Sequence, residues 1–193
     1  LQNAFILFAS MVFYGWWDWR YLGLVFISAA TDYLAAIAMD RTDHAKRRKA
    51  LLILSLLVNL GMLGFFKYYN FFIESFNAAF TFMGQDISLS TLRIVLPVGI
   101  SFYTFQTLSY TIDVYRKEMK ASHDPVAFGA FILFFPQLVA GPIERASNLL
   151  PQFMGPRTFD EAKARDGMRQ MLWGLFKKVV IADNCAEQVD LIF

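Results

Sequence analysis

The sequence has few residues that could support metal, disulfide or histidine chemistry. Its single cysteine, Cys185, excludes an internal disulfide, and its only histidines are His44 and His123. No Cys or His pair has metal-ligand spacing, and no glycine-rich phosphate loop or G-x-S-x-G motif is present. We therefore expect no metal, no cofactor and no serine nucleophile in this chain.

Charged residues are also scarce, at 18% of the chain, and the net charge is only +2. A soluble domain typically has about 25% charged and about 45–50% apolar residues. Here 56% of residues are hydrophobic and 17% are aromatic. A soluble fold of this length could not bury so many large apolar side chains, whereas a bilayer solvates them. The composition predicts a membrane protein and no nucleic-acid partner.

Several apolar runs are long enough to cross a bilayer, which takes about 20 residues. We predict spanning segments at 1–17, 21–39, 50–66 and 92–114. The aromatic cluster at 16–21 separates the first two segments and is typical of a membrane interface. The sequence thus predicts several crossings, with lipid as one partner.

Other segments are predicted to be irregular. Pro97 and Gly99 interrupt 92–114 and predict a kink. The amphipathic run at 71–83 predicts a surface helix or a short dipping segment. The apolar run at 125–139 is short and is followed by Gly-Pro, which is typical of a re-entrant or broken helix. The predicted fold is an all-α, polytopic integral membrane helical bundle with kinked and re-entrant helices, forming a single membrane domain over 1–193.

Charges indicate orientation and burial. Five basic residues in the loop 41–49 predict that this loop is cytoplasmic, and the basic residues at 116–120 fit a return to the same side. Asp32 lies in the middle of a predicted span, where an unpaired charge costs roughly 2.5–3.5 kcal/mol. We therefore expect Asp32 to be buried against protein.

The last part of the chain predicts an amphipathic helix at the cytoplasmic interface. Thr158 and Glu161 have the spacing of a capping box, so this helix is expected to begin near Phe159. The doublet at 177–178 is interpreted either as an interface anchor or as a site for an anionic donor or partner. The apolar residues that recur at helical spacing are Met168, Met171, Leu172, Leu175 and Val179.

Polar residues are concentrated on one helical face of the segment 96–116. Tyr103, Gln106, Tyr110 and Asp113 lie at positions i, i+3, i+7 and i+10, and threonines form a second stripe beside them. Such groups would not face lipid. They either hold the bundle together by interhelical hydrogen bonds or line a polar tunnel or substrate path.

A second polar position lies between two prolines in the sequence FFPQLVAGPIER, at 134–145. This segment is either a plain kinked helix end or a re-entrant element that lines a cavity. Its Gln137 joins the candidates for the tunnel or substrate path. The full set is Tyr103, Gln106, Tyr110, Asp113 and Gln137.

Three motifs in fixed order resemble the serial signatures of bacterial membrane-bound O-acyltransferases: LPVGISFYTFQTLSYTIDVYR, FFPQLVAGPIER and GLFKKVVIAD. The early segments FYGWWDWRYLGL and LGFFKYYNFF are also similar, so the resemblance covers nearly the whole chain. The LVAGPIER form resembles the alginate O-acetylase branch and related exopolysaccharide or peptidoglycan O-acetylation proteins. The Ser-Ser-Gly-Pro version of the D-alanine transfer branch is absent.

The resemblance implies a multi-pass enzyme of the bacterial inner membrane. Such proteins pass an acetyl-type acyl group from a cytoplasmic donor to a hydroxyl of an exported polysaccharide, often with a periplasmic acyltransferase partner. The family histidine lies in a later membrane segment, so we expect it downstream of Phe193, with no catalytic residue in this chain and no activity of the chain alone. The alternative is a non-enzymatic transporter or flippase component, which inverted repeats would favour; none are found.

Overall fold

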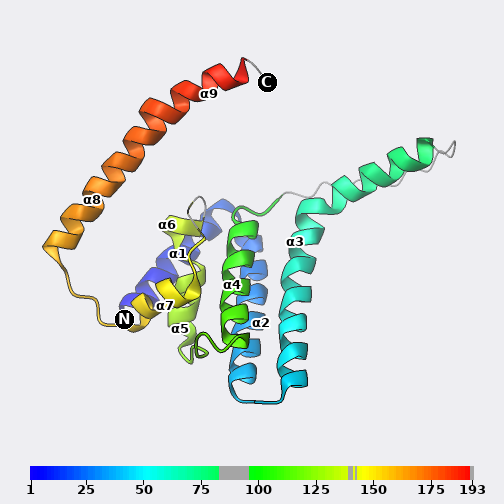
Figure 1. The fold of residues 1–193 in the computed structure, drawn as a ribbon, viewed down its shortest axis with the longest axis horizontal. Coiled ribbons are helices and arrows are strands. Elements are labelled where there is room, and N and C mark those ends of the chain that lie inside the picture. Colours follow the sequence, from blue (N-terminus) through cyan, green and yellow to red (C-terminus); the bar gives the residue numbers. More distant parts are fainter. Residues whose placement is uncertain (83–95, 139–140, 142, 192–193) are drawn as a thin grey trace. The chain divides into compact units, whose positions relative to one another are not determined.

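A computed structural model describes residues 1–82, 96–138, 141 and 143–191. All regular structure in these residues is helical, as predicted (Figure 1). The chain divides into two units, Leu1–Gly155 and Pro156–Phe193, each with its own helices. A single membrane domain over 1–193 stays a prediction.

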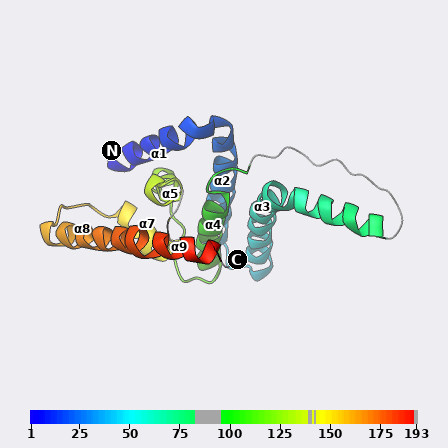
Figure 2. The same cartoon turned by 90° about the horizontal axis from the view of Figure 1, so that it is seen from above.

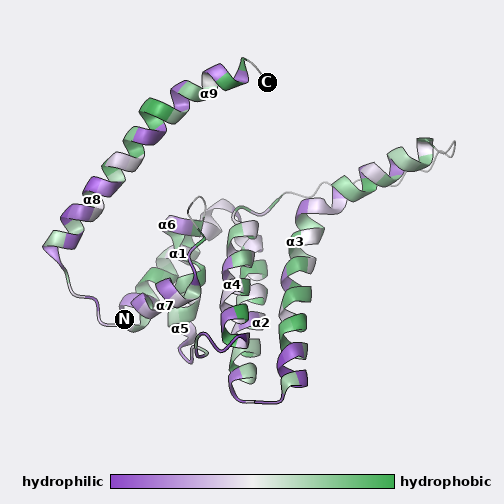
Figure 3. Cartoon of the chain, viewed as in Figure 1, coloured by the Kyte–Doolittle hydropathy of each residue, from purple (hydrophilic) through white to green (hydrophobic). Residues whose placement is uncertain are grey.

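The first helices of the larger unit form the predicted spanning segments. Helix α1 (Gln2–Asp18) leads through the short η1 (Trp19–Tyr21) into α2 (Leu22–Asp40), and α3 (Ala45–Phe82) follows. The stretch Gln2–Asp40 and helix α3 are both long and apolar enough to cross a membrane. In Figure 3 the beginning of α3 is hydrophilic and the part that follows it is hydrophobic. The all-helical fold and these apolar helices make the protein a membrane helical bundle.

Helix α3 is longer than predicted. Its 38 residues correspond to about 57 Å, well beyond an apolar bilayer core of about 30 Å. Figures 1 and 2 both show that its second half bends away from α2. The prediction of a separate segment at 71–83 is wrong as far as Phe82, because the helix continues through its polar residues; Met83 lies outside the described residues.

Helix α4 (Ile100–Tyr115) packs against both α2 and α3. The predicted interruption at Pro97 and Gly99 takes the form of a turn that precedes the helix, with the Ile100 N–H donating to the Pro97 carbonyl at 3.2 Å. Gly99 has φ 75°, and a Cβ there would lie 2.6 Å from the Leu138 carbonyl oxygen. Only glycine fits this position, so the helix starts where the chain makes this close approach. Residues 92–95 of the predicted span lie outside the described residues.

The prediction of a broken helix at 125–139 is confirmed up to residue 138. Helix α5 (Pro125–Ile132) is followed by the single turn α6 (Phe135–Leu138). Asp124 caps α5 by accepting from the N–H groups of Val126 and Ala127, at 2.8 and 3.0 Å. At about 12 Å, α5 is too short to cross a bilayer.

Helix α7 (Ala146–Met154) completes the larger unit. Helix α5 packs against α1 and α7, and most of its side chains are buried. Aromatic rings join these helices, including Phe134 against Phe153 with ring centroids 5.5 Å apart. The apolar part of the core therefore centres on the broken helix.

The smaller unit is a helical run: α8 (Glu161–Phe176), η2 (Lys177–Ala182) and α9 (Asp183–Asp190). The predicted helix and its start near Phe159 are confirmed, but the capping residue is not Thr158. Asp160 is the N-cap and accepts from the Lys163 N–H at 3.1 Å, because its carboxylate stands directly before the first turn. Lys178 forms an ion pair with Asp183 at 2.7 Å. A place at the cytoplasmic interface stays a prediction.

Candidate functional site

The buried carboxylate of Asp32 is the centre of a polar cluster between α2, α3 and α4. Asp32 is fully buried and accepts hydrogen bonds from the Ser55 hydroxyl and, at 2.9 Å, from the Asn59 side-chain amide. Asn59 in turn accepts from the Ser28 hydroxyl at 2.5 Å and from the Thr107 hydroxyl at 3.4 Å. The prediction that Asp32 is buried against protein is confirmed.

The sequence contains a signal for this cluster in the spacing of its polar residues, beyond the burial of Asp32 alone. Ser28 and Asp32 are four residues apart on α2, and Ser55 and Asn59 are four residues apart on α3. Each pair therefore shares one helical face. Thr107 belongs to the predicted threonine stripe of α4. Matching polar faces on three apolar helices could have predicted that these helices pack together.

The polar stripe of α4 is buried, as its spacing predicted. Tyr103, Gln106, Tyr110 and Asp113 are between 0% and 6% exposed. The threonine stripe is buried as well, so α4 is polar on more than one side and most of its surface is covered by protein, although Phe105 is exposed. A helix with this composition depends on its neighbours to solvate it.

Two members of the stripe hold loops and the broken helix in place. The Gln106 side-chain amide donates to the Phe131 carbonyl of α5 at 2.9 Å. The Tyr110 hydroxyl accepts from the Ser122 N–H at 2.9 Å. The first contact is an interhelical hydrogen bond, and the second ties α4 to the loop before α5.

The other predicted site residues have polar atoms that no described residue satisfies. These atoms are the Tyr103 hydroxyl, one carboxylate oxygen of Asp113 and the side-chain nitrogen of Gln137. Gln137 lies on α6, apart from the α4 stripe in sequence, and is half-buried. Because a buried polar atom without a partner costs about 1–3 kcal/mol, such atoms mark places where another group is expected. Their role in a tunnel stays a prediction.

The residues that could act as acid, base or metal ligand do not form a site in the described part of the chain. His44 and His123 are both exposed. Asp124, next to His123, caps α5 and does not orient the imidazole. No group of three or more His, Cys, Asp or Glu side chains that could bind a metal occurs among the described residues. What this part offers is a buried polar scaffold.

The known proteins that are similar to this chain are all named for the O-acetylation of a polysaccharide. The chain is 39% identical over its whole length to a probable alginate O-acetylase of Pseudomonas syringae pv. tomato and 40% identical to one of Pseudomonas aeruginosa. It is 33% identical, over 99% of its length, to a peptidoglycan O-acetyltransferase of Helicobacter pylori. No family model and no solved structure matches the chain.

The chain spans only part of these relatives. It covers 37% of each of the two alginate proteins and 40% of the peptidoglycan protein. The similarity nevertheless includes every segment that carries a family-like motif, from the aromatic cluster at 16–21 to the basic doublet at 177–178.

Proposed function

We propose that the chain is part of a membrane-bound O-acyltransferase, which transfers an acetyl-type acyl group to hydroxyl groups of an exported polysaccharide. The observation that carries this proposal is the similarity over the whole chain to relatives named for alginate and for peptidoglycan O-acetylation. Both acceptors are cell-envelope polymers with free hydroxyls. Alginate is the first acceptor to test, because the relatives named for alginate are more similar to this chain than the one named for peptidoglycan.

In this proposal the chain supplies the scaffold and part of the path, and it does not supply the catalytic base. Transfer to a hydroxyl needs a base positioned in a defined pocket. The exposed positions of His44 and His123 do not provide one. We place the base on a histidine that this chain does not contain, and the wall of the path at the Tyr103–Asp113 stripe with Gln137.

The proposal also includes an orientation in the membrane. The last turn of α2, the first turn of α3 and the end of α4 lie at one end of the helices, where basic residues gather (Figure 1). An excess of Lys and Arg marks the cytoplasmic side. The acyl donor would therefore approach from this end, and the acceptor, with a periplasmic acyltransferase partner, from the other side of a bacterial inner membrane. Nothing in the comparisons favours the transporter alternative.

The test uses the full-length protein in inverted and in right-side-out membrane vesicles. The probe is acetyl-labelled coenzyme A added outside, with alginate enclosed in the vesicles as acceptor and alkali-labile label on the polymer as the readout. Inverted vesicles should transfer label, and right-side-out vesicles should not. No transfer above vesicles that lack the protein, in either orientation and with either alginate or peptidoglycan, would contradict the proposed function. Transfer only in right-side-out vesicles would contradict the orientation alone.

A further inference from the structure

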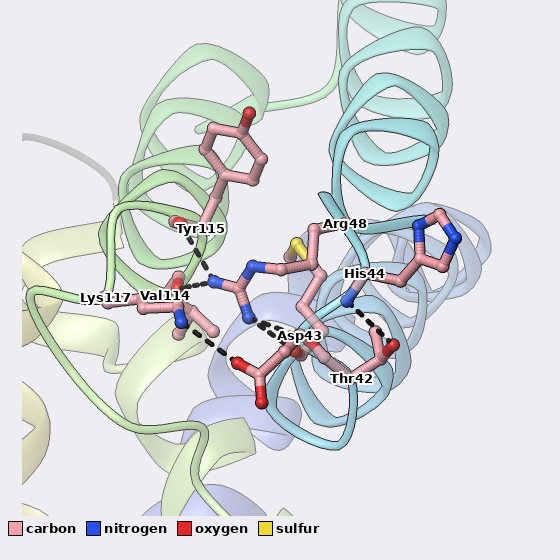
Figure 4. Close-up of polar contacts among 8 residues, drawn as sticks. Thr42, Asp43, His44, Arg48, Val114, Tyr115 and Lys117 are labelled. Atoms are coloured by element: carbon pink, nitrogen blue, oxygen red, sulfur yellow. Dashed lines mark hydrogen bonds and ion pairs between the residues drawn. The ribbon is translucent and has the colours of Figure 1, made fainter. Parts of the chain in front are cut away.

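Arg48 is a buried cation within a row of otherwise exposed basic residues. Its neighbours Arg47 and Lys49 are exposed, but Arg48 itself is only 7% exposed. Its guanidinium donates to four backbone carbonyls (Figure 4). The acceptors are Met39 at 2.5 Å, Thr42 at 3.5 Å, Val114 at 2.9 Å and Tyr115 at 2.9 Å.

Three of these carbonyls belong to the C-terminal ends of two helices. Met39 is in the last turn of α2, and Val114 and Tyr115 end α4. The last carbonyls of a helix have no partner within it and carry the negative end of the helix dipole. No carboxylate of the described residues lies within ion-pair distance of Arg48. One guanidinium therefore satisfies both helix ends, which a single-point ammonium could not do.

The end of α4 has a fixed and strained geometry. Lys117 adopts φ 62°, and the N–H groups of Lys117 and Glu118 donate back to Val114 and Asp113 at 3.1 and 2.9 Å. This is a helix-ending motif in which the left-handed position is usually glycine. Lys117 also forms an exposed ion pair with Asp43 at 3.0 Å. A non-glycine residue in this conformation is disfavoured, so contacts around it must hold the turn.

We propose that Arg48 is a positioning residue: it ties the ends of α2 and α4 together and thereby fixes the depth and rotation of the α4 polar stripe. The link is short, because Arg48 binds Val114, the residue next to Asp113. The proposal has two parts. The clamp itself rests on the contacts alone, and its effect on acyl transfer rests on the proposed function.

The surroundings of Arg48 allow a chemical test. A cavity of about 420 Å³ is lined by Arg48, Lys117, Glu118 and Met119, among others. Deleting the Arg48 side chain should open a space that connects with this cavity. A free guanidinium ion could then occupy the place of the missing group and donate to the same carbonyls.

The experiment compares Arg48→Ala with Arg47→Ala in the full-length protein. Amide hydrogen exchange at 114–118 reports opening of the α4 end, and acetyl transfer reports function. Arg48→Ala should speed exchange there by about tenfold or more, because several charge-assisted hydrogen bonds are lost. Arg47→Ala should leave exchange and transfer as in the wild type. Arg48→Lys keeps the charge, so its exchange rate and acetyl transfer should lie between those of the two alanine variants. It replaces Arg48→Ala in the comparison if the alanine variant does not accumulate.

Rescue separates positioning from a general loss of structure. Guanidinium at concentrations far below denaturing ones should slow exchange and restore transfer in Arg48→Ala, and methylammonium at equal ionic strength should not. Equal exchange in Arg48→Ala and Arg47→Ala would overturn the clamp, whatever the transfer assay shows. Faster exchange with unchanged transfer would overturn the effect on the stripe. If the wild type transfers no acetyl group, the proposed function fails, and the exchange data still decide on the clamp.

Discussion

Helix α4 packs against two different surroundings, one polar and one apolar. Towards α2 and α3 the Thr107 hydroxyl contacts the Ser28 hydroxyl and the Asn59 side-chain oxygen, each at 3.4 Å, within the polar cluster around Asp32. On the side of the broken helix, Tyr110 lies against Phe128, with ring centroids 4.7 Å apart, within a core of aromatic and aliphatic side chains. Lipid is as apolar as such a core, so apolar burial alone does not choose one arrangement of helices in a bilayer.

The difference suggests a division of roles. Apolar packing is collectively large, but it tolerates many rearrangements of similar volume. Hydrogen bonds in lipid are directional and few, so they select the register in which helices meet. We expect mutations in the apolar part to lower the stability most. Mutations in the polar part should lower the stability less but also disturb the register in which the helices pack.

The largest effect is expected for Phe131→Ala, which empties part of the core around the broken helix. Phe131 is fully buried, and its removal leaves a cavity that its neighbours fill only in part. The free energy of unfolding should fall by about 4 kcal/mol. The matched control is Phe5→Ala, since Phe5 is 72% exposed. Thermal melting of the full-length protein in detergent checks both, and equal losses would contradict the assigned packing.

Asp32→Ala comes next, because it removes the acceptor at the centre of the polar cluster. The Ser55 hydroxyl and the Asn59 amide would be left buried without their partner. At about 1–3 kcal/mol for each orphaned group, we expect a loss of about 3 kcal/mol. Leu34→Ala, at a position that is 64% exposed two residues away, should cost far less. A stability equal to that of the wild type would show that Asp32 does not join the three helices.

Gly99→Ala tests the point where α4 begins beside α6. The new Cβ would lie 2.6 Å from the Leu138 carbonyl oxygen, and φ 75° disfavours alanine. We expect a loss of about 2 kcal/mol from the left-handed conformation and the contact. Gly61→Ala is the control: a Cβ there meets nothing within 4 Å, and alanine favours a helix by about 1 kcal/mol. Equal melting temperatures for the two variants would contradict this geometry.

Gln106→Leu tests the link between the polar stripe and the broken helix. It removes the hydrogen bond to Phe131 with little change in volume, so stability should fall by about 1 kcal/mol. If the stripe lines the substrate path, acetyl transfer should fall further than this loss explains. Transfer per folded molecule and melting are measured on the same preparation, with Phe105→Leu as the control at a neighbouring exposed position. If Gln106→Leu lowers the stability but leaves turnover unchanged, Gln106 has only a structural role and does not line the substrate path.

The smallest effect is expected for Asp43→Asn at the basic end. Lys117 beside Asp43 holds the pKa of that carboxyl below its ordinary value. Because the pKa of Asp43 is lower in the folded state, the ion pair stabilises the fold above about pH 4, the ordinary pKa of a carboxyl group. This stabilisation is lost as the pH falls through the folded-state pKa. Both side chains are exposed, so the effect is small and salt reduces it. Melting of wild type and variant should differ slightly at neutral pH and converge as the pH falls below the folded-state pKa of Asp43; a difference independent of pH would contradict the pairing.

Much of the fold could be predicted from the sequence because lipid imposes strict rules. The burial of Asp32 and the inward polar stripe followed from the cost of polar groups in an apolar solvent. The broken helix followed from the shortness of the apolar run at 125–139 and the Gly-Pro after it. The errors were local: the start of α4 after Gly99, the continuation of α3 to Phe82 and the cap at Asp160. Each depended on one backbone conformation or one cap, which composition and periodicity do not resolve.

For this protein the sequence alone determined the membrane class, the family resemblance and the faces that had to be inside, since these depend only on residue type and spacing. It did not determine which inward groups would meet. Only the tertiary structure brought Asn59 to Asp32, Gln106 to the Phe131 carbonyl and Arg48 to the ends of two helices. Arg48 shows the reason most clearly: in the sequence it is one of five equivalent basic residues, and only the packing of α2, α3 and α4 makes it the one that is buried.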